Sequence, residues 1–222
     1  MKVNTDGVLL GAAMTINASD MNMLDIGTGT GTIALMAAQR SDRAVNIHAI
    51  DIDEASATEA AANFRNSPWN SSLKAFHMPL DEYEKIADGH EYDLVFSNPP
   101  YFEDSLKAPE ERRNNARHTS TGLSYREILD FASRHLSSQG RVSVVLPSET
   151  EYQLCRHARM DGLHLMRIIR VRTVPHKAPS RIVAEFSRVR VDSPVEEDLV
   201  IQEKGKYTQE YLSLTNEFYL FA

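Results

Sequence analysis

The hydrophobic residues of this chain gather in short apolar runs, which alternate with segments whose apolar residues recur at every third or fourth position. Short apolar runs are typical of buried β-strands, and recurrence at three and four is typical of amphipathic helices. Ala57, Ala60 and Phe64 show the helical spacing within residues 54–66. Asp53 directly precedes that segment and is a candidate N-cap.

The two patterns alternate along the chain and predict an α/β fold. Apolar runs predict strands at 21–28, 46–53, 72–78, 92–97, 141–147, 163–174 and 181–189. Helical patterns fall at 32–40, 54–66, 81–87, 123–137 and 149–161. We therefore predict a mostly parallel sheet of seven strands with helices on both faces. A connection too short for a helical crossover joins the last two runs, so they should form an antiparallel C-terminal hairpin.

The length and composition indicate an ordinary globular protein. With 222 residues, we expect a single domain over 1–222 and a monomer. No apolar run approaches the roughly 18 residues that a membrane span needs, and no hydrophobic segment follows a basic start. The single Cys155 rules out an internal disulfide, and no Cys/His spacing suits zinc. We predict a cytoplasmic protein with no metal and no membrane partner.

The charge is distributed unevenly along the chain. The formal net charge is −7, but residues 156–190 hold nine Arg and Lys against two acids, so this segment carries +7 and the rest −14. The nine cations are Arg156, Arg159, Arg167, Arg170, Arg172, Lys177, Arg181, Arg188 and Arg190. A basic segment on an acidic body fits either a nucleic-acid footprint or an ordinary solvated face.

Three polar stretches directly follow or end predicted strands. They are DIGTGTG at 25–31, DID at 51–53 and SNPPY at 97–101. Binding sites in parallel sheets lie at the carboxyl ends of the strands. We therefore expect the three stretches to contribute to one site.

The glycine-rich stretch suits a nucleotide-like ligand. Gly27, Gly29 and Gly31 let the backbone pass close to a ligand, and the following helix start offers free N–H groups. A dinucleotide fingerprint would require glycine where Thr32 stands. Asp25, just before the loop, would suit an amino group better than a pyrophosphate.

A second carboxylate follows at the end of the second strand. Asp51 lies 20 residues after Gly31, where it could accept hydrogen bonds from ribose hydroxyls. Asp51 alone suits NAD and S-adenosylmethionine equally well. The missing glycine and the extra Asp25 favour S-adenosylmethionine, so we predict that the two acids and the three glycines bind this cofactor.

The SNPPY stretch suits a planar amine. Such an amine is a poor nucleophile because its lone pair is delocalised, and two acceptors that hold its N–H groups would help it to attack. The Asn98 side-chain oxygen and the Pro99 carbonyl could be those acceptors, with Pro99 and Pro100 stiffening the loop. Tyr101 could stack on the flat ring and place the nitrogen in line with a methyl sulfonium. Positioning and fixed dipoles would do this work without a strong base.

These residues resemble known motifs. DIGTGTG, AIDID and SNPPY resemble class I S-adenosylmethionine-dependent methyltransferases of the N6-adenine type, which have a Rossmann-like fold. A closer resemblance, to the tRNA1(Val) N6-methyltransferase family, covers nearly the whole chain. It is carried by MKVNTDGVLLGA, IALMAAQR, NFRNSPW, SNPPYF, ARHT and YTQEYLSLTNEFYL.

The resemblance implies a function and a set of site residues. The family methylates an adenine beside the anticodon, so tRNA is the expected partner and S-adenosylhomocysteine the expected product. By the resemblance, cofactor binding falls to Asp25, Gly27, Gly29, Gly31 and Asp51. The target base would be received by Asn98, Pro99, Pro100 and Tyr101.

The chain departs from the family pattern at three places. The family's Trp after LLGA is Ala13 or Met14 here. Met1 aligns with an internal Met of the family, so the family's N-terminal segment is expected to be absent. Pro79 stands near the place where these enzymes often carry an Asp that reaches the cofactor adenine.

Some basic and aromatic residues have two possible interpretations. Residues 103–122 could clamp RNA phosphates or form a solvated loop. Their candidate contacts are Lys107, Arg112, Arg113, Arg117 and His118. Trp69 could pack against a helix end or stack on a base.

Three other functions remain open from the sequence. A protein glutamine amide is also planar with two N–H groups, so a glutamine methyltransferase could use the same motif. DNA adenine methylation is a third possibility, and a non-catalytic S-adenosylmethionine-binding module a fourth. The absence of room for a separate helical domain before Gly27, and the intact 98–101 motif, favour the tRNA methyltransferase.

Overall fold

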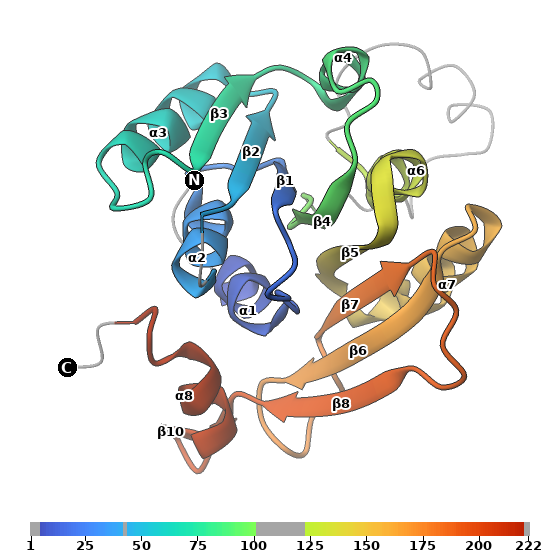
Figure 1. Ribbon diagram of the computed structural model, residues 1–222. Helices are drawn as coiled ribbons and strands as arrows, with labels where there is room; N and C mark the ends of the chain where they lie inside the picture. The colour runs from blue at the N-terminus through green and yellow to red at the C-terminus, as the bar shows by residue number, and fades with distance from the viewer. Residues whose placement is uncertain (1–4, 42–43, 101–122, 220–222) are drawn as a thin grey trace, which may run out of the picture.

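The computed structural model describes residues 5–41, 44–100 and 123–219 (Figure 1). One sheet of eight strands forms its centre, in the order β3-β2-β1-β4-β5-β7-β6-β8. The strands are β1 (Asn22–Ile26), β2 (Asn46–Asp51), β3 (Leu73–His77), β4 (Tyr92–Ser97), β5 (Leu136–Pro147), β6 (His164–Arg172), β7 (Arg181–Ser187) and β8 (Val195–Val200). A small separate hairpin joins β9 (Gln202–Glu203) and β10 (Lys206–Tyr207).

The sheet is mostly parallel, as predicted. Strands β3, β2, β1, β4 and β5 pair in parallel. β7 pairs antiparallel with both β5 and β6, and β6 pairs in parallel with β8. The predicted antiparallel pairing of the runs at 163–174 and 181–189 is therefore confirmed. Strand β7, formed by the second of these runs, is antiparallel to the other seven strands of this sheet.

Helices cover both faces of the sheet. They are α1 (Thr5–Ala13), α2 (Thr32–Arg40), α3 (Glu54–Arg65), α4 (Leu80–Ile86), α6 (Tyr125–His135), η2 (Ser148–Thr150), α7 (Glu151–Met160) and α8 (Gln209–Thr215). Helices α1, α2, α3 and α8 share one buried hydrophobic cluster with the sheet. Helices α4, α6 and α7 share a second cluster with its other face. No helix in the described ranges is long and apolar enough to cross a membrane.

The sheet has eight strands rather than the seven predicted. The missed strand, β8, is exposed over its first four residues and buries only Leu199 fully, so it lacks an apolar run. Three consecutive acids, Glu196, Glu197 and Asp198, occupy its centre. Their partners are arginines of β6, which only the folded sheet brings alongside. An edge strand held by side-chain charges gives no hydrophobic signal.

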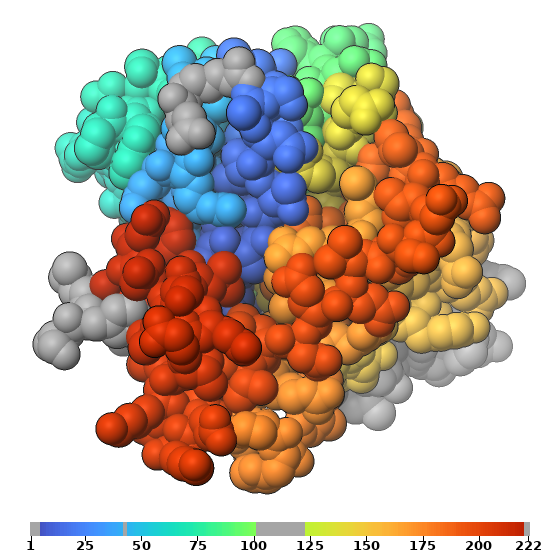
Figure 2. Space-filling model, turned by 60° about the horizontal axis from the view of Figure 1, so that its bottom comes forward, coloured from blue at the N-terminus to red at the C-terminus, as the bar shows by residue number. Residues whose placement is uncertain are grey.

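The two ends of the described chain lie together. The buried residues Val8, Ala12 and Met36 of α1 and α2 form a small cluster with Leu214 and Phe218 from the C-terminal segment. Figure 2 shows this C-terminal segment, in red, beside the blue surfaces of α1 and α2. Helix α1 is buried at seven of its nine positions and was not among the predicted helices.

Candidate active site

The glycine-rich loop joins β1 to α2 and needs glycine at three positions. Gly27, Gly29 and Gly31 have φ angles of 73°, 58° and 81°, in the left-handed region that side chains disfavour. At Gly31 a Cβ would also lie 2.4 Å from Cε1 of Phe64 on α3. Part of this glycine pattern is thus required by helix packing, whatever the loop binds.

Backbone hydrogen bonds hold the loop against β2. The amides of Gly27 and Thr28 both donate to the carbonyl oxygen of Ile50, at 2.9 and 3.0 Å. The amide of Gly29 donates to Oδ2 of Asp51 at 2.8 Å. The loop and the carboxyl end of β2 therefore form one rigid unit.

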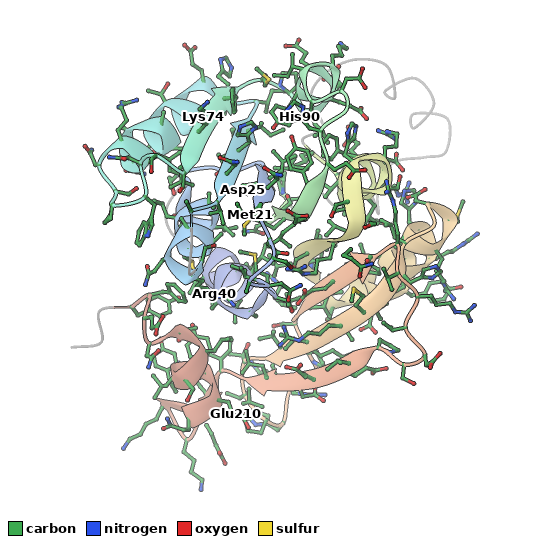
Figure 3. The ribbon with its side chains drawn as sticks, in the orientation of Figure 1. Met21, Asp25, Arg40, Lys74, His90 and Glu210 are labelled. Carbon is green, nitrogen blue, oxygen red and sulfur yellow. The ribbon has the colours of Figure 1, made fainter. Side chains whose placement is uncertain are left out.

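Asp25 is a buried carboxylate with an unused acceptor. Its side chain is fully buried, near the centre of the molecule (Figure 3). Thr28 Oγ1 donates to its Oδ2 at 2.7 Å, but Oδ1 has no hydrogen-bond partner among the described residues. Burial raises the pKa of Asp25 to about 7, and the charge of Asp51 adds to this shift. The Thr28 hydrogen bond and the backbone amide of Ala34 in α2 oppose it. A cation that reached Oδ1 would relieve the cost of burying the ionised form.

Asp51 is half-buried at the end of β2, and both its oxygens accept backbone N–H groups. Oδ2 accepts from Gly29, and Oδ1 from Asp53 at 2.9 Å. Asp53 itself caps α3 through Ser56, as the sequence predicts. Each carboxylate oxygen has a second lone pair, so Asp51 can still accept from a ligand hydroxyl.

Ile52, beside Asp51, is a site candidate that the sequence reasoning missed. It directly follows β2, beside the predicted cofactor acid, and is 69% exposed. His77 Nε2 lies 3.1 Å from the Ile52 carbonyl oxygen and helps to fix the local backbone. The sequence predicts a ligand contact for Asp51 and a helix cap for Asp53, but it gives no signal for the apolar residue between them.

The SNPPY stretch begins where β4 ends, directly beside the glycine loop. Phe96 of β4 pairs with Asp25 of β1. The buried Ser97 donates from Oγ to the carbonyl oxygen of Ile26 at 2.6 Å, which ties the ends of the two strands together. Asn98 is then half-buried, Pro99 buried and Pro100 exposed.

Several predicted residues lie outside the described ranges. They are Tyr101, Lys107, Arg112, Arg113, Arg117 and His118, all within 101–122. Just after that segment, Leu123 approaches the glycine loop, since a Cβ on Gly27 would lie 3.1 Å from its Cδ2. Trp69 packs against the core cluster of α1, α2 and α3, which favours its structural interpretation.

Pro79 directly precedes α4, at the carboxyl end of β3. Its extended backbone forms the N-cap of that helix, without a side-chain hydrogen bond. Met78 before it donates its amide to the Asp51 carbonyl oxygen at 3.0 Å. The segment around Pro79 is therefore fixed next to Asp51, although proline offers no polar side chain there.

The segment 156–190 is not the continuous basic surface that its sequence suggests. Four of its arginines form salt bridges, at 2.5–3.2 Å, with acids that mostly lie elsewhere in the sequence. These arginines are Arg167, Arg170, Arg172 and Arg181. Arg188 donates instead to the carbonyl oxygens of Ser133 and Leu136. The acids of β8 lie outside residues 156–190, but in the folded sheet they pair with the arginines of β6. A charge count over 156–190 alone therefore overstates the positive charge of this surface.

One group of described side chains could hold a metal ion, although the sequence predicts none. Asp130 of α6, with His157 and Asp161 from α7 and its C-cap, places its ligand atoms within 4.8 Å of one another. His157 Nε2 lies 3.4 Å from Asp130 Oδ1 and 3.3 Å from Asp161 Oδ2. Burial raises the pKa of Asp161, and the charge of Asp130 raises it further. Among the described residues, His157 Nε2 and Asp161 Oδ2 are buried without a hydrogen-bond partner.

Comparison with known proteins identifies the family. A family model described as the methyltransferase small domain matches residues 7–165. A tRNA1(Val) (adenine(37)-N6)-methyltransferase of Bacteroides fragilis is 41% identical over 220 residues, which are 99% of this chain and 91% of the relative. The chain belongs to this methyltransferase family. Proteins of the same name from Flavobacterium psychrophilum and Photobacterium profundum are 40% and 38% identical over 222 residues, covering 99% of this chain and 93% and 92% of their own lengths.

Solved structures show the same fold. A predicted O-methyltransferase from Agrobacterium tumefaciens superposes with a TM-score of 0.69 at 16% identity, over 94% of this chain and 95% of its own. TrmN from Thermus thermophilus gives a TM-score of 0.54 at 24% identity, over 77% of this chain and 44% of its own. The predicted Rossmann-like methyltransferase fold is therefore confirmed, with the strand count corrected.

The family and the fold imply S-adenosylmethionine as the cofactor, and the residues present fit it. The unpartnered Oδ1 of Asp25 suits the ammonium of the methionyl part. Asp51 retains acceptor capacity for a ribose, and the exposed Ile52 beside it offers an apolar surface.

Proposed function

We propose that this methyltransferase transfers the methyl group of S-adenosylmethionine to the exocyclic N6 of an adenine in tRNA, beside the anticodon of a valine tRNA. The observation that supports this best is the position of Asn98 and Pro99, one strand away from the glycine loop and tied to it through Ser97. The names of relatives about 40% identical over nearly the whole chain support the tRNA substrate.

We propose that the carboxyl ends of β1 and β2 hold the cofactor. Ionised Asp25 would accept a hydrogen bond from the ammonium group, and Asp51 would accept from the ribose hydroxyls. Ile52 would pack against the adenine ring of the cofactor. This apolar contact does not depend on the Asp that the family often carries near Pro79. Gly27, Gly29 and Gly31 would let the backbone approach the methionyl part.

Residues 98–101, here called the acceptor loop, would prepare the amine. When bound, the cofactor supplies a methyl group on a positively charged sulfur. The Asn98 side-chain oxygen and the Pro99 carbonyl would each accept one N–H of the adenine amine, while Tyr101 stacks on the base and Pro100 stiffens the loop. Formation of the N–C bond would break the C–S bond, whose electrons would remain on sulfur to give S-adenosylhomocysteine. The extra amine proton then passes to water.

The test is transfer of labelled methyl groups to unmodified tRNA by the parent protein and by Asn98→Ala. We expect Asn98→Ala to lower kcat by about 100-fold or more, as removal of one positioned dipole does elsewhere. Calorimetry should show unchanged cofactor affinity, because Asn98 lies on the acceptor side. Asn70→Ala, which changes an exposed asparagine, is the matched control.

Two outcomes would contradict the proposal. Equal methyl transfer by Asn98→Ala and the parent would remove the role of the acceptor loop. Methyl incorporation into protein glutamine rather than tRNA would assign the other substrate class. The single-domain organisation, the monomeric state and the cytoplasmic location remain predictions from the sequence.

A further inference from the structure

The solvent face of α7 carries positive charge, as do the exposed Lys177, Arg188 and Arg190 elsewhere in the basic segment. Arg156 and Arg159 are both exposed on this helix, unlike the arginines of β6 and β7 that pair with acids. Arg159 donates from Nε to the Cys155 carbonyl of its own helix. The acid in the first turn, Glu151, is already bound by Arg170 at 2.5 Å.

An aromatic side chain completes this face. Tyr152 is 67% exposed. Tyr152, Arg156 and Arg159 follow at spacings of four and three residues, so they lie on one side of the helix. Leu154 and Ala158 occupy the opposite side and are fully buried in the core. The aromatic and both guanidiniums are therefore directed away from the protein.

The fold places the start of α7 at the same edge of the sheet as the acceptor loop. Ser97 at the end of β4 pairs with Val144 of β5, and β5 ends three residues later at Pro147. The single turn η2 then leads directly into α7, which lies beside α6 (Figure 1). At 1.5 Å per residue, Arg156 and Arg159 lie about 6 and 10 Å further along the helix than Tyr152.

We propose that the α7 face formed by Tyr152, Arg156 and Arg159 binds the RNA strand next to the target adenine; this inference rests on the proposed function. Recognition of an adenine in a stacked loop requires neighbouring bases to be splayed, and exposed aromatic side chains receive such bases. Guanidinium groups bind the phosphates that follow, by charge-assisted hydrogen bonds. A positive face on a chain of net charge −7 favours a polyanion over an ordinary protein surface.

The test measures binding of an unmodified tRNA transcript to the full chain over a range of salt concentrations. Arg156→Gln and Arg159→Gln should each weaken binding and lower the slope of log K against log salt by about 1, because each removes one phosphate contact. Tyr152→Ala should weaken binding by about fivefold or more with the slope unchanged, because it removes stacking rather than charge. Calorimetric affinity for S-adenosylmethionine should not change in any of them.

Lys74→Gln is the matched control, since Lys74 is an exposed cation on β3 at the far end of the sheet from α7 (Figure 3). If the three α7 variants bind tRNA like this control, the inference is wrong. If they instead change self-association in sedimentation and leave tRNA binding intact, the face is a protein interface and the inference is also overturned. Parent protein that binds tRNA through α7 but transfers no methyl group would contradict the proposed function alone.

Discussion

At the scale of single residues, two groups of the candidate site are unfavourable for the stability of the folded protein. Asp25 is fully buried with one oxygen unpartnered, and burial raises its pKa to about 7. Gly31 adopts a backbone conformation that other residues resist. The unpartnered oxygen of Asp25 suits a ligand, and glycine at position 31 permits close packing against Phe64. The effect of each on stability can be measured.

The Asp25→Asn variant should be more stable than the parent at neutral and alkaline pH. The Asp25 carboxyl ionises near pH 3.8 in the unfolded chain but near 7 in the folded protein. Its protonated form therefore contributes stability below pH 3.8, and this contribution is lost as the pH rises through about 7. The gain for Asn should grow over that window to about 4 kcal/mol, while cofactor binding is lost. Denaturant titrations from pH 4 to 8 that show a constant difference would contradict this.

The Gly31→Ala variant should be destabilised more than Gly89→Ala. Both glycines have φ near 80°, so alanine strains the backbone at each by about 1 kcal/mol. At Gly31 the new Cβ would also meet Phe64 at 2.4 Å, whereas at Gly89 it meets nothing within 4 Å. We expect a further cost of about 1–3 kcal/mol at Gly31, from overpacking. Equal unfolding midpoints would show that Phe64 moves aside freely, and Phe64→Leu should restore part of the loss.

At the scale of elements, arginines hold α1 and β8 in place. Carbonyl oxygens at the end of α1 and just after it accept hydrogen bonds from Arg40 of α2, Arg141 of β5 and Arg167 of β6, at 2.7–2.9 Å. These groups would otherwise be unsatisfied in the protein interior. Arg167 also binds acids on β7 and β8, so one side chain joins three elements.

The cost of removing an arginine from β6 should depend on the burial of its partner. Arg167→Gln leaves Glu185, which is 2% exposed, without its cation and should lower the free energy of unfolding by about 3 kcal/mol. Arg172→Gln removes a pair with the 60% exposed Asp198 and should cost less than about 1 kcal/mol. Urea unfolding of both variants gives the comparison. Equal losses would mean that Glu185 is reached by water or protonated once Arg167 is gone.

At the scale of the whole molecule, the sheet brings distant segments of the chain to one edge. The loop after β1, the end of β2 and the start of the acceptor loop meet there, although Asp25 and Asn98 are far apart in sequence. The C-terminal segment closes the opposite part of the fold, where Tyr211 of α8 is buried in the core cluster that contains α1 and α2. Docking of α8 therefore supports the helices that lie under the glycine loop.

Removing the Tyr211 ring should weaken the packing of α8 against the core. Tyr211 is 2% exposed, and Tyr211→Ala should cost about 3–5 kcal/mol because it opens a cavity between α8 and the sheet. Tyr207→Ala, at a 45% exposed tyrosine nearby, should cost far less. Thermal unfolding measures both, and hydrogen exchange should show faster exchange in α1 of the first variant. Similar losses in the two variants would place the Tyr211 ring outside the cooperative core.

The strongest local patterns were enough to predict most of the fold. Residues 32–40 and 92–97 form α2 and β4 with the predicted ends, because the apolar pattern agrees with the glycine before the helix and with the prolines after the strand. The pattern missed α1, whose buried residues include two glycines, and β8, whose centre is acidic. The site was predicted from the same local chemistry, although Ile52 was overlooked because an exposed apolar residue has no signature in sequence alone.

The sequence by itself determined the order of the elements, the left-handed glycine loop and the chemical types gathered at the carboxyl ends of the strands, because these depend on neighbours along the chain. Only the tertiary structure decided which charges survive at the surface. Strand β8 places its acids against Arg167, Arg170 and Arg172, whereas Arg156 and Arg159 stay exposed on α7. It also decided that Asp25 is buried with an unused oxygen, since burial depends on elements that pack from both sides of the sheet.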